Sequence, residues 1–338
     1  MRTVELGNTT GFSLRNRIKS YRQAAVEMRS HLAERPFEWG KFQGVFNFEI
    51  NGVFREIMNF ERENLQRGKE EAVYKFKRLF VKHIRKEFLH GEYIVWSLEK
   101  PFGYAGDYKI IDEIYLNLPK TSGFERLYDN YFQMSAISVA VRNRKEDFKK
   151  LISNVAVKGK ENRIRVLSLG SGPCRELSEL KAAGLLQQGK VIVDCYDNDV
   201  GAHLHGSNLL GSPDNVNFVR ENVVRLALKK DLERQLPQRY DLIYSSGLFD
   251  YLDERVSVRL IENISKLLTR DGALAISDVR DKYSNPSVHF MEWVGDWNLI
   301  YRDDEVFRRF FLEAGFKEKN LEIGYEQQGI MQYVIARR

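Results

Sequence analysis

The residues best suited to hold a ligand in this chain are Gly170, Ser171 and Gly172, within the stretch RIRVLSLGSGPCREL. An apolar run of strand type leads into them and a helical pattern follows at once, so we expect a strand, a tight turn and a helix start. This geometry brings a nucleotide-like cofactor against bare backbone at the carboxyl edge of a parallel sheet. Gly170 permits the turn, and Gly172 removes a Cβ atom where a ligand would come close.

Two acids follow the next predicted strand. Asp197 and Asp199 come directly after the apolar run 191–196, roughly 25 residues past the glycine turn. A carboxylate at the end of this strand can accept hydrogen bonds from both hydroxyls of a ribose. The spacing therefore predicts a ribose contact, with Asp197 preferred and Asp199 as the second choice.

Polar or small residues also follow the third and fourth predicted strands. Asn222 and Val223 follow the strand over 216–219, where an amide can bind an adenine edge and the valine can cover the ring. Ser245 ends the strand over 241–245, where a small residue leaves room for a reacting group. Because the carboxyl ends of parallel strands meet at one edge, we expect these residues to line a single site.

The pattern of elements predicts the fold class. Residues 12–160 are mostly helical in pattern, whereas strands and helices alternate from residue 163 onward. Such alternation indicates an α/β fold with a mostly parallel sheet and helices on both faces. The predicted strands are 164–169, 191–196, 216–219, 241–245, 272–278 and 331–336, with a further candidate near 321–326, and the predicted helices are 174–188, 201–210, 223–235, 254–269 and 303–314.

Composition excludes several classes of protein. The net charge of +6 is modest for 338 residues and the basic residues are interleaved with acids, so the sequence does not argue for nucleic-acid binding. Cys174 and Cys195 are the only cysteines, too few for a disulfide framework or a four-cysteine metal site, and we expect no metal. We see neither a signal peptide nor an apolar run long enough to span a membrane, and therefore expect a soluble cytoplasmic protein.

Residues 163–338 resemble a class I S-adenosylmethionine-dependent methyltransferase. The features occur in that family's order: the glycine turn, an acid after the second strand, a polar residue after the third, then YDLIYSSGLFDYL and LLTRDGALAI. The resemblance implies a Rossmann-like sheet with an antiparallel last strand, and S-adenosylmethionine as the cofactor. It implies that the cofactor contacts Gly170, Ser171, Gly172, Asp197, Asp199, Asn222, Val223 and Ser245.

The chain departs from this family at four positions. Ser168 stands where an acid is usual, Cys174 where a third glycine is usual, Asn222 where Asp is usual, and Tyr251 where His is frequent. An NAD-dependent dehydrogenase is the rival for the same turn, but it expects glycine or alanine at position 175, which is Arg175 here.

Three further segments narrow the resemblance. KPFGYAGDY, AVRNR and NPSVHFMEWVGDWNLIYR are similar to motifs of bacterial proteins that form the methyl ester of 3-hydroxypalmitic acid. The similarity spans residues 95–338. It implies methylation of a carboxylate on a small molecule. From the change of pattern along the chain we expect residues 1–130 to form a helical cap region and residues 131–338 the cofactor-binding domain.

Methyl transfer is an in-line displacement, so alignment and exclusion of water are the main tasks. A carboxylate acceptor is ionised at pH 7 and needs no general base, whereas a hydroxyl or amine does. The catalytic candidates are Tyr104, Asp107, Tyr251 and His289, and Asp278 and Tyr283 are further candidates for a base. A helix cap explains Asp107 equally well, and a surface or packing role is the favoured explanation of His289. Four arginines could bind an acceptor carboxylate or form structural ion pairs: Arg142, Arg144, Arg280 and Arg302.

Three alternatives stay open. The enzyme could consume S-adenosylmethionine without methylation, by cyclisation or aminocarboxypropyl transfer, and release methylthioadenosine. It could also be a binding module without turnover. A nucleic-acid methyltransferase is disfavoured, because the expected Asn/Asp-Pro-Pro-aromatic run is replaced by Ser245-Ser246-Gly247-Leu248. The oligomeric state does not follow from the sequence.

Overall fold

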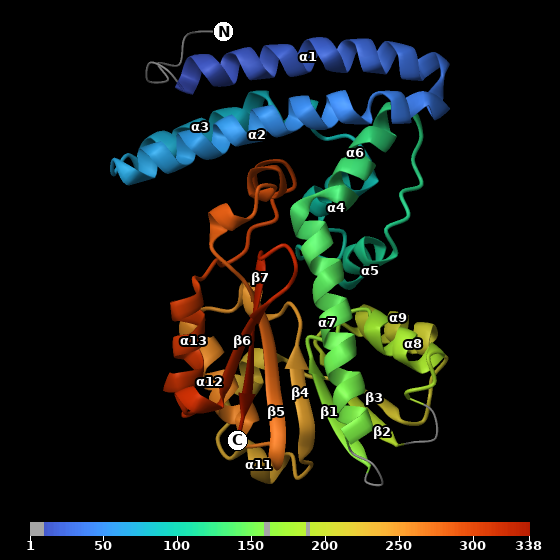
Figure 1. Cartoon of the computed structure of the whole chain (residues 1–338), viewed down its shortest axis with the longest axis vertical. Helices are drawn as coiled ribbons and strands as arrows, with labels where there is room; N and C mark the ends of the chain where they lie inside the picture. The colour runs from blue at the N-terminus through green and yellow to red at the C-terminus, as the bar shows by residue number, and fades with distance from the viewer. Residues whose placement is uncertain (1–9, 159–162, 187–189) are drawn as a thin grey trace. The chain divides into compact units, whose positions relative to one another are not determined.

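The structure is a computed structural model, and it describes residues 10–158, 163–186 and 190–338. The chain forms two compact units, each assembled from separate segments of sequence (Figure 1). The helical unit comprises the chain up to Gly106, Asn117–Ser138 and Asn285–Asn298. The sheet unit comprises Asp107–Leu116, Val139–Ser284 and Leu299–Arg338. The predicted domains, 1–130 and 131–338, meet at a single boundary in the sequence. Each observed unit contains segments from both sides of that boundary.

One seven-stranded sheet forms the centre of the sheet unit. Its strands are β1 (Ile164–Leu169), β2 (Val191–Asp197), β3 (Val216–Arg220), β4 (Tyr240–Ser245), β5 (Leu268–Val279), β6 (Leu321–Tyr325) and β7 (Met331–Arg337). They lie in the order β3-β2-β1-β4-β5-β7-β6. Strands β1 to β5 run parallel, β7 runs antiparallel to β5, and β6 antiparallel to β7. The predicted Rossmann-like fold class is confirmed, including its antiparallel strand at the C-terminus.

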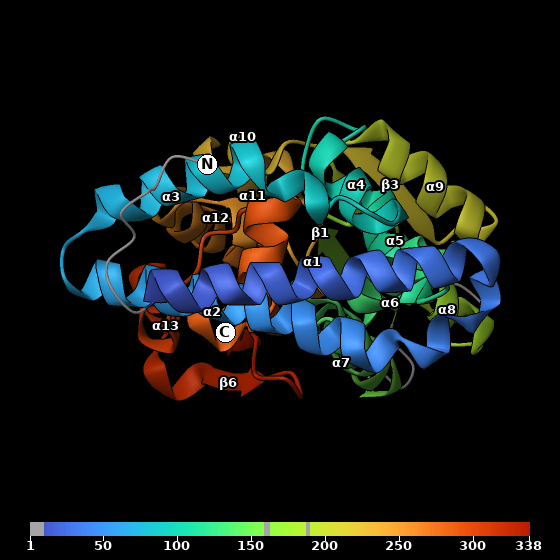
Figure 2. The same ribbon diagram turned by 90° about the horizontal axis from the view of Figure 1, so that it is seen from above.

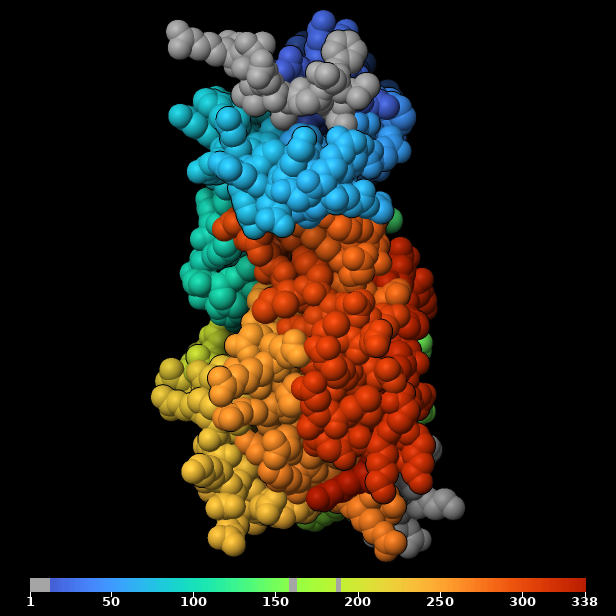
Figure 3. Space-filling model, turned by 90° about the vertical axis from the view of Figure 1, so that its left-hand side faces the viewer, coloured from blue at the N-terminus to red at the C-terminus, as the bar shows by residue number. Residues whose placement is uncertain are grey.

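Helices cover both faces of this sheet. One face packs against α7 (Ala136–Lys158), α8 (Arg175–Ala182) and α9 (Val200–Leu210), through buried side chains such as Phe148, Leu177 and Leu210. The other face packs against α10 (Val223–Leu228), α11 (Leu232–Gln235), α12 (Glu254–Ser265) and α13 (Asp304–Glu313). Figure 3 shows the outer surface of this second layer in yellow to red.

Aromatic side chains of α13 belong to that second core. Phe307, Phe310 and Phe311 are each fully buried. Burial of each side chain contributes about 1.5–3 kcal/mol of hydrophobic stabilisation. The three rings lie on one face of the helix, and packing of that face on the sheet stabilises the helix. These residues therefore pack the sheet unit and do not line a surface cavity.

Three predicted helices differ from the observed ones. The segment 223–235 forms α10 and α11 separately, because Asp231 adopts a positive φ of 51° that a continuous helix does not allow. The helix predicted over 254–269 ends at Ser265, since β5 already begins at Leu268. The predicted helix 174–188 runs over Arg175–Ala182, and residues 187–188 lie outside the described chain.

The helical unit is built on long amphipathic helices. Its main helices are α1 (Thr10–Glu34), α2 (Gln43–Gln66), α3 (Glu70–His83), α4 (Glu92–Glu99) and α6 (Gly123–Met134). Figure 2 shows α1 lying along α2. Buried aromatic rings join the helices, and Trp293, from a short π-helical turn (Phe290–Val294), lies 5.5 Å from the ring of Phe80. This unit therefore has an apolar core of its own.

The segment after KPFGYAG belongs to the sheet unit and forms α5 (Tyr108–Leu116). Asp107 caps this helix, accepting hydrogen bonds from the backbone N–H groups of Lys109 at 2.9 Å and Ile110 at 3.0 Å. The helix-cap interpretation of Asp107 is confirmed.

A buried carboxylate ties α5 to the helices beside it. Asp112 accepts two hydrogen bonds from Arg175 of α8, both at 2.7 Å, and lies 2.8 Å from Nε2 of His205 on α9. The Asp112 side chain is 3% exposed. A bidentate, buried pair of this kind is far stronger than a surface ion pair. Arg175, which argues against a dinucleotide-binding glycine motif, thus serves to hold α5 on the sheet unit.

Within the parts of the chain that the structure describes, no helix has both the length and the apolar character needed to cross a bilayer.

Replacing Arg175 with leucine tests this anchor. Because the variant leaves Asp112 buried with only His205 as its partner, we expect the free energy of unfolding to fall by about 2–4 kcal/mol. Urea unfolding monitored by circular dichroism measures the change. Arg309→Leu is the matched control, since its partner Glu254 is about half exposed and the pair should contribute less than about 1 kcal/mol. Equal losses in both variants would contradict the structural role of Asp112.

Candidate functional site

The site begins at the turn after β1, where the strand order reverses between β1 and β4. The N–H groups of Gly170 and Ser171 donate to the carbonyl of Tyr196, at 2.8 and 3.2 Å. Gly170 and Gly172 have φ values of 61° and 53°, a region that favours glycine. The turn is thus tied to the end of β2.

The two glycines have different neighbours. A Cβ atom added at Gly170 would lie 3.1 Å from Cβ of Leu248, in the segment after β4. A Cβ atom added at Gly172 would meet no protein atom within 4 Å. Gly170 is therefore required by the packing of the protein itself, whereas Gly172 presents bare backbone to open space that a ligand can enter.

Cys174 occupies the position where the resemblance leads us to expect a third glycine. This residue is fully buried at the start of α8 with a φ of 55°. Its Sγ would lie 3.3 Å from a Cβ atom added at Gly206 of α9. A third glycine in such turns permits close packing of elements. Here the missing Cβ is on the neighbouring helix instead, at Gly206, so close packing survives with cysteine in the turn.

Asp197 joins two loops of the site. Its carboxylate accepts a hydrogen bond from the N–H of Gly172 at 3.0 Å and another from the N–H of Asp199 at 3.0 Å. Asp199 in turn caps α9, accepting from the N–H of Gly201 at 2.7 Å. Asp197 is only partly buried, so its carboxylate can accept further hydrogen bonds from a ligand.

Asn222 and Val223 lie at the start of α10. Asn222 caps the helix through Oδ1, which accepts from the N–H of Val224 at 2.9 Å. The cap uses only Oδ1, so the amide nitrogen can still donate to a ligand. Val223 is half-buried against the core under α10.

Ser245 has a role inside the sheet. Its hydroxyl donates to the carbonyl of Leu169 at 3.0 Å, and the residue has no exposed surface. This hydrogen bond joins the ends of β4 and β1 at the switch point. The predicted contact between Ser245 and a ligand stays a prediction.

The catalytic candidates lie in different units. Tyr251 is in the sheet unit, on the short helix Phe249–Tyr251, and is 42% exposed. Asp107 is also there, but it is buried as the cap of α5. Tyr104 and His289 belong to the helical unit. His289 is fully buried, with Nε2 3.2 Å from a carboxylate oxygen of Glu61, so its packing interpretation gains support. Catalytic roles for all four stay predictions.

Sequence reasoning missed Tyr108, the residue after Asp107. A Cβ atom added at Gly201 would lie 3.0 Å from the Tyr108 hydroxyl, which places that ring over the first turn of α9. Burial and the charges of Asp199 and Asp107 raise the pKa of the Tyr108 hydroxyl. The glycine-flanked GYAGDY pattern marked the segment, but nothing in it marked this ring as the one beside Asp199.

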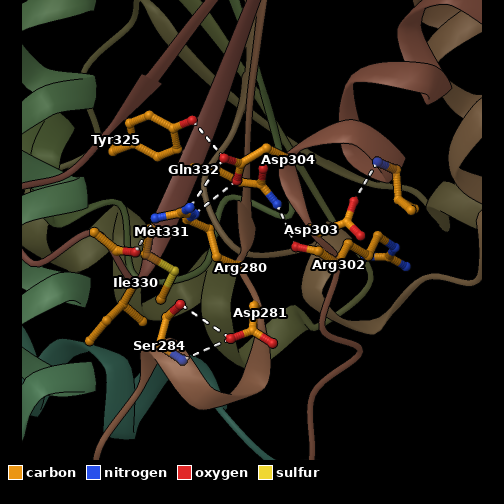
Figure 4. Close-up of polar contacts among 12 residues, drawn as sticks. Arg280, Asp281, Ser284, Arg302, Asp303, Asp304, Tyr325, Ile330, Met331 and Gln332 are labelled. Atoms are coloured by element: carbon orange, nitrogen blue, oxygen red, sulfur yellow. Dashed lines mark hydrogen bonds and ion pairs between the residues drawn. The ribbon is translucent and has the colours of Figure 1, made fainter.

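Three of the four candidate arginines have clear structural partners. Arg280 forms two bonds to Asp304, at 2.8 and 3.1 Å, beside Tyr325, which donates to the same carboxylate (Figure 4). Arg302 binds Asp278 and the carbonyl of Phe249. Arg142 donates to the carbonyl of Ile114 at 3.3 Å. The fourth, Arg144, lies 3.3 Å from Asp250, but among the described residues its buried Nε has no hydrogen-bond partner.

The described residues contain no group of three or more His, Cys, Asp or Glu side chains that could hold a metal ion.

No model of a protein family matches this chain, and no curated protein matches it in sequence. Among solved structures, a possible exported protein from Bordetella parapertussis is similar, with a TM-score of 0.57 and 18% identity over 78% of this chain and 95% of that chain. At this identity the likeness concerns the fold alone. Magnesium protoporphyrin IX methyltransferase from Synechocystis, with S-adenosylhomocysteine bound, matches with a TM-score of 0.47 and 13% identity over 72% of this chain and 96% of that chain. N-methyltransferase NodS from Bradyrhizobium japonicum, also with S-adenosylhomocysteine, matches with a TM-score of 0.39 and 12% identity over 58% of this chain and 87% of that chain.

The open space over Gly172 yields a direct test. We expect Gly172→Leu to abolish binding of S-adenosylhomocysteine, because the side chain occupies the space where the resemblance places the cofactor. The positive φ costs about 1–2 kcal/mol of stability in addition. Titration calorimetry and thermal melting measure the two effects.

Gly211→Leu is the matched control for backbone strain. Gly211 has a φ of 64° and only the flexible Nζ of Lys181 within 4 Å of an added Cβ atom. We expect a similar loss of stability with unchanged binding. Binding that survives in Gly172→Leu would show that the ligand does not lie over this turn.

Proposed function

We propose that the sheet unit binds S-adenosylmethionine and that the protein is a methyltransferase acting on a carboxylate of a small molecule such as a hydroxy fatty acid. The observation that carries the proposal is the open backbone at Gly172, joined through Asp197 to the end of β2 at the switch point of the sheet. The proposed cofactor contacts are the turn residues, Asp197 or Asp199 for the ribose, and Asn222 with Val223 for the adenine.

Several features favour this cofactor over a nicotinamide dinucleotide. The sheet ends in the antiparallel pair β6 and β7, as the resemblance implies. Arg175, at the position where a dinucleotide-binding turn expects a small residue, is committed to Asp112. Gly206 compensates for Cys174, so this departure from the family leaves the packing of the turn intact.

The residues of the chain have mainly positioning tasks in this reaction. When bound, the cofactor supplies a methyl group whose transfer forms an oxygen–carbon bond on the acceptor, breaks the carbon–sulfur bond and leaves the electron pair on sulfur. The backbone at Gly172 and the carboxylate of Asp197 hold the nucleoside in place, and Tyr108 covers the neighbouring turn of α9. A carboxylate acceptor is already ionised at pH 7, so no side chain has to remove a proton.

We further propose that residues 1–130 act as a helical cap region, and that the protein works in the cytoplasm on small molecules. Tyr104, Asp107, Tyr251 and His289 are the catalytic candidates of this proposal. Cyclisation or aminocarboxypropyl transfer is the second candidate function, because Ser168 lacks the acid that the family usually offers to the amino group of the cofactor.

Mass spectrometry separates these functions. Purified protein incubated with S-adenosylmethionine and a hydroxy fatty acid should yield S-adenosylhomocysteine and a methyl ester 14 Da heavier than the acid, by simple addition of one CH₂ group. Methylthioadenosine in place of S-adenosylhomocysteine would support the second candidate. Tight binding with neither product would indicate a binding module.

Asp197→Ala tests the ribose contact. Loss of a hydrogen bond to a charged group costs about 1.5–3 kcal/mol, so we expect the dissociation constant for S-adenosylhomocysteine to rise about 10- to 100-fold in calorimetry. Asp199→Ala is the comparison variant, because its carboxylate caps α9 and is the second choice for the ribose. A loss confined to Asp199→Ala would move the ribose contact to that residue.

A further inference from the structure

Arg144 lies at the reacting end of the sheet unit. It stands on α7 and is 4% exposed. A Cβ atom added at Gly247 would lie 3.0 Å from its Nη2 atom, so the guanidinium lies against the backbone just after β4. The next residue, Leu248, is the one that packs on Gly170. The positive charge is therefore placed at the switch point, close to the glycine turn.

The hydrogen bonds of Arg144 are incomplete. Nη1 donates to Asp250 at 3.3 Å and to the sulfur of Met331 at 3.7 Å, and the hydroxyl of Tyr115 bonds to the guanidinium. Among the described residues, Nε has no hydrogen-bond partner although it is buried. Good arginine–carboxylate pairs have distances of about 2.7–2.9 Å and frequently use two nitrogens.

Arg302 provides the contrast within the same cluster. It contacts both oxygens of Asp278, at 2.9 and 3.1 Å, and donates to the carbonyls of Phe249 and Leu252. Through these hydrogen bonds Arg302 connects the segment after β4 to the end of β5. Arg144 lacks a partner of the kind that Arg302 has. Because a buried charge with an unused donor is costly, this arrangement destabilises the protein unless another group fills the donor.

Two arginines and two carboxyl groups are buried together in this cluster. Burial raises the pKa of Asp250, and burial together with the charge of Asp250 raises the pKa of Asp278 well above its usual range. The other groups that face Arg144 are Tyr115, Tyr251 and Tyr333, and burial raises the pKa of Tyr115 and Tyr333, which keeps them neutral.

We propose that Arg144 binds a carboxylate at the reacting end of the site, using the donors that its protein partners leave unfilled. This proposal rests on the proposed function and names the chemistry that the site recognises. Two sources offer the same group: the amino-acid tail of S-adenosylmethionine, and an acidic acceptor. An acceptor held through one carboxylate oxygen would keep the other oxygen available as the nucleophile.

The test compares ligands that differ only in the carboxylate. The double variant Arg144→Met/Asp250→Asn removes the charge together with its partner, so no charge is left unpaired at this position. Calorimetry measures S-adenosylhomocysteine and methylthioadenosine, which lacks the amino-acid tail. With S-adenosylhomocysteine present, it also measures 3-hydroxydecanoate and its methyl ester.

If Arg144 holds the cofactor tail, the double variant should bind S-adenosylhomocysteine about 10- to 100-fold more weakly and methylthioadenosine normally. If it holds the acceptor, the loss should appear for 3-hydroxydecanoate alone. Asp250→Asn is the matched control: it keeps the charge of Arg144, so it should bind all ligands at least as tightly as the wild type does. An equal loss for S-adenosylhomocysteine and methylthioadenosine, or no loss for either carboxylate, overturns the proposal.

Two further readouts keep the test decisive. A wild-type protein that binds neither S-adenosylhomocysteine nor methylthioadenosine overturns the proposed function itself, whereas normal wild-type binding with an unaffected double variant overturns only the role of Arg144. Should the double variant lack a cooperative melting transition, Arg144→Lys replaces it. Lysine keeps the charge but not the planar fork, so the same ligand should lose affinity, by a smaller factor.

Discussion

The candidate site depends on one carboxylate, that of Asp197. It accepts the N–H of Gly172 from the turn after β1 and the N–H of Asp199 from the loop after β2. Two loops that are distant in sequence thereby become a single surface at the edge of the sheet. The same carboxylate is the predicted ribose ligand, so the group that holds the two loops together is also the group proposed to bind the nucleoside.

Close packing beside this turn is achieved by an exchange between neighbouring elements. The turn carries Cys174 where its family resemblance leads one to expect glycine, and α9 carries Gly206 opposite it. Close packing of the turn on α9 requires that one of the two residues in contact has no Cβ atom, and either residue can be the glycine. A motif read along one segment misses such a compensation, because the second residue lies on another helix.

The buried charged residues of the sheet unit fall into two groups: those with a full set of hydrogen-bond partners, and Arg144, which lacks one among the described residues. Asp112 with Arg175, and Asp278 with Arg302, form short, well-filled pairs that hold α5 and the segment after β4 in place. Arg144 shares the burial of these groups without their full set of partners. An unused buried donor costs stability, and in our proposal a ligand carboxylate supplies the missing acceptor.

Local patterns in the chain were enough to predict the sheet and the order of the site segments, since strand alternation, glycine turns and polar residues at strand ends are all visible over short stretches. They also predicted the cap at Asp107, a local interaction over three residues. The pairing of Asp112 with Arg175, the hydrogen bond of Ser245 inside the sheet, and the positions of Tyr108 and Arg144 beside the site became visible in the folded chain alone. Such contacts join side chains from elements far apart in sequence, and the pairing of charged or aromatic residues across elements leaves no periodic signal in the chain.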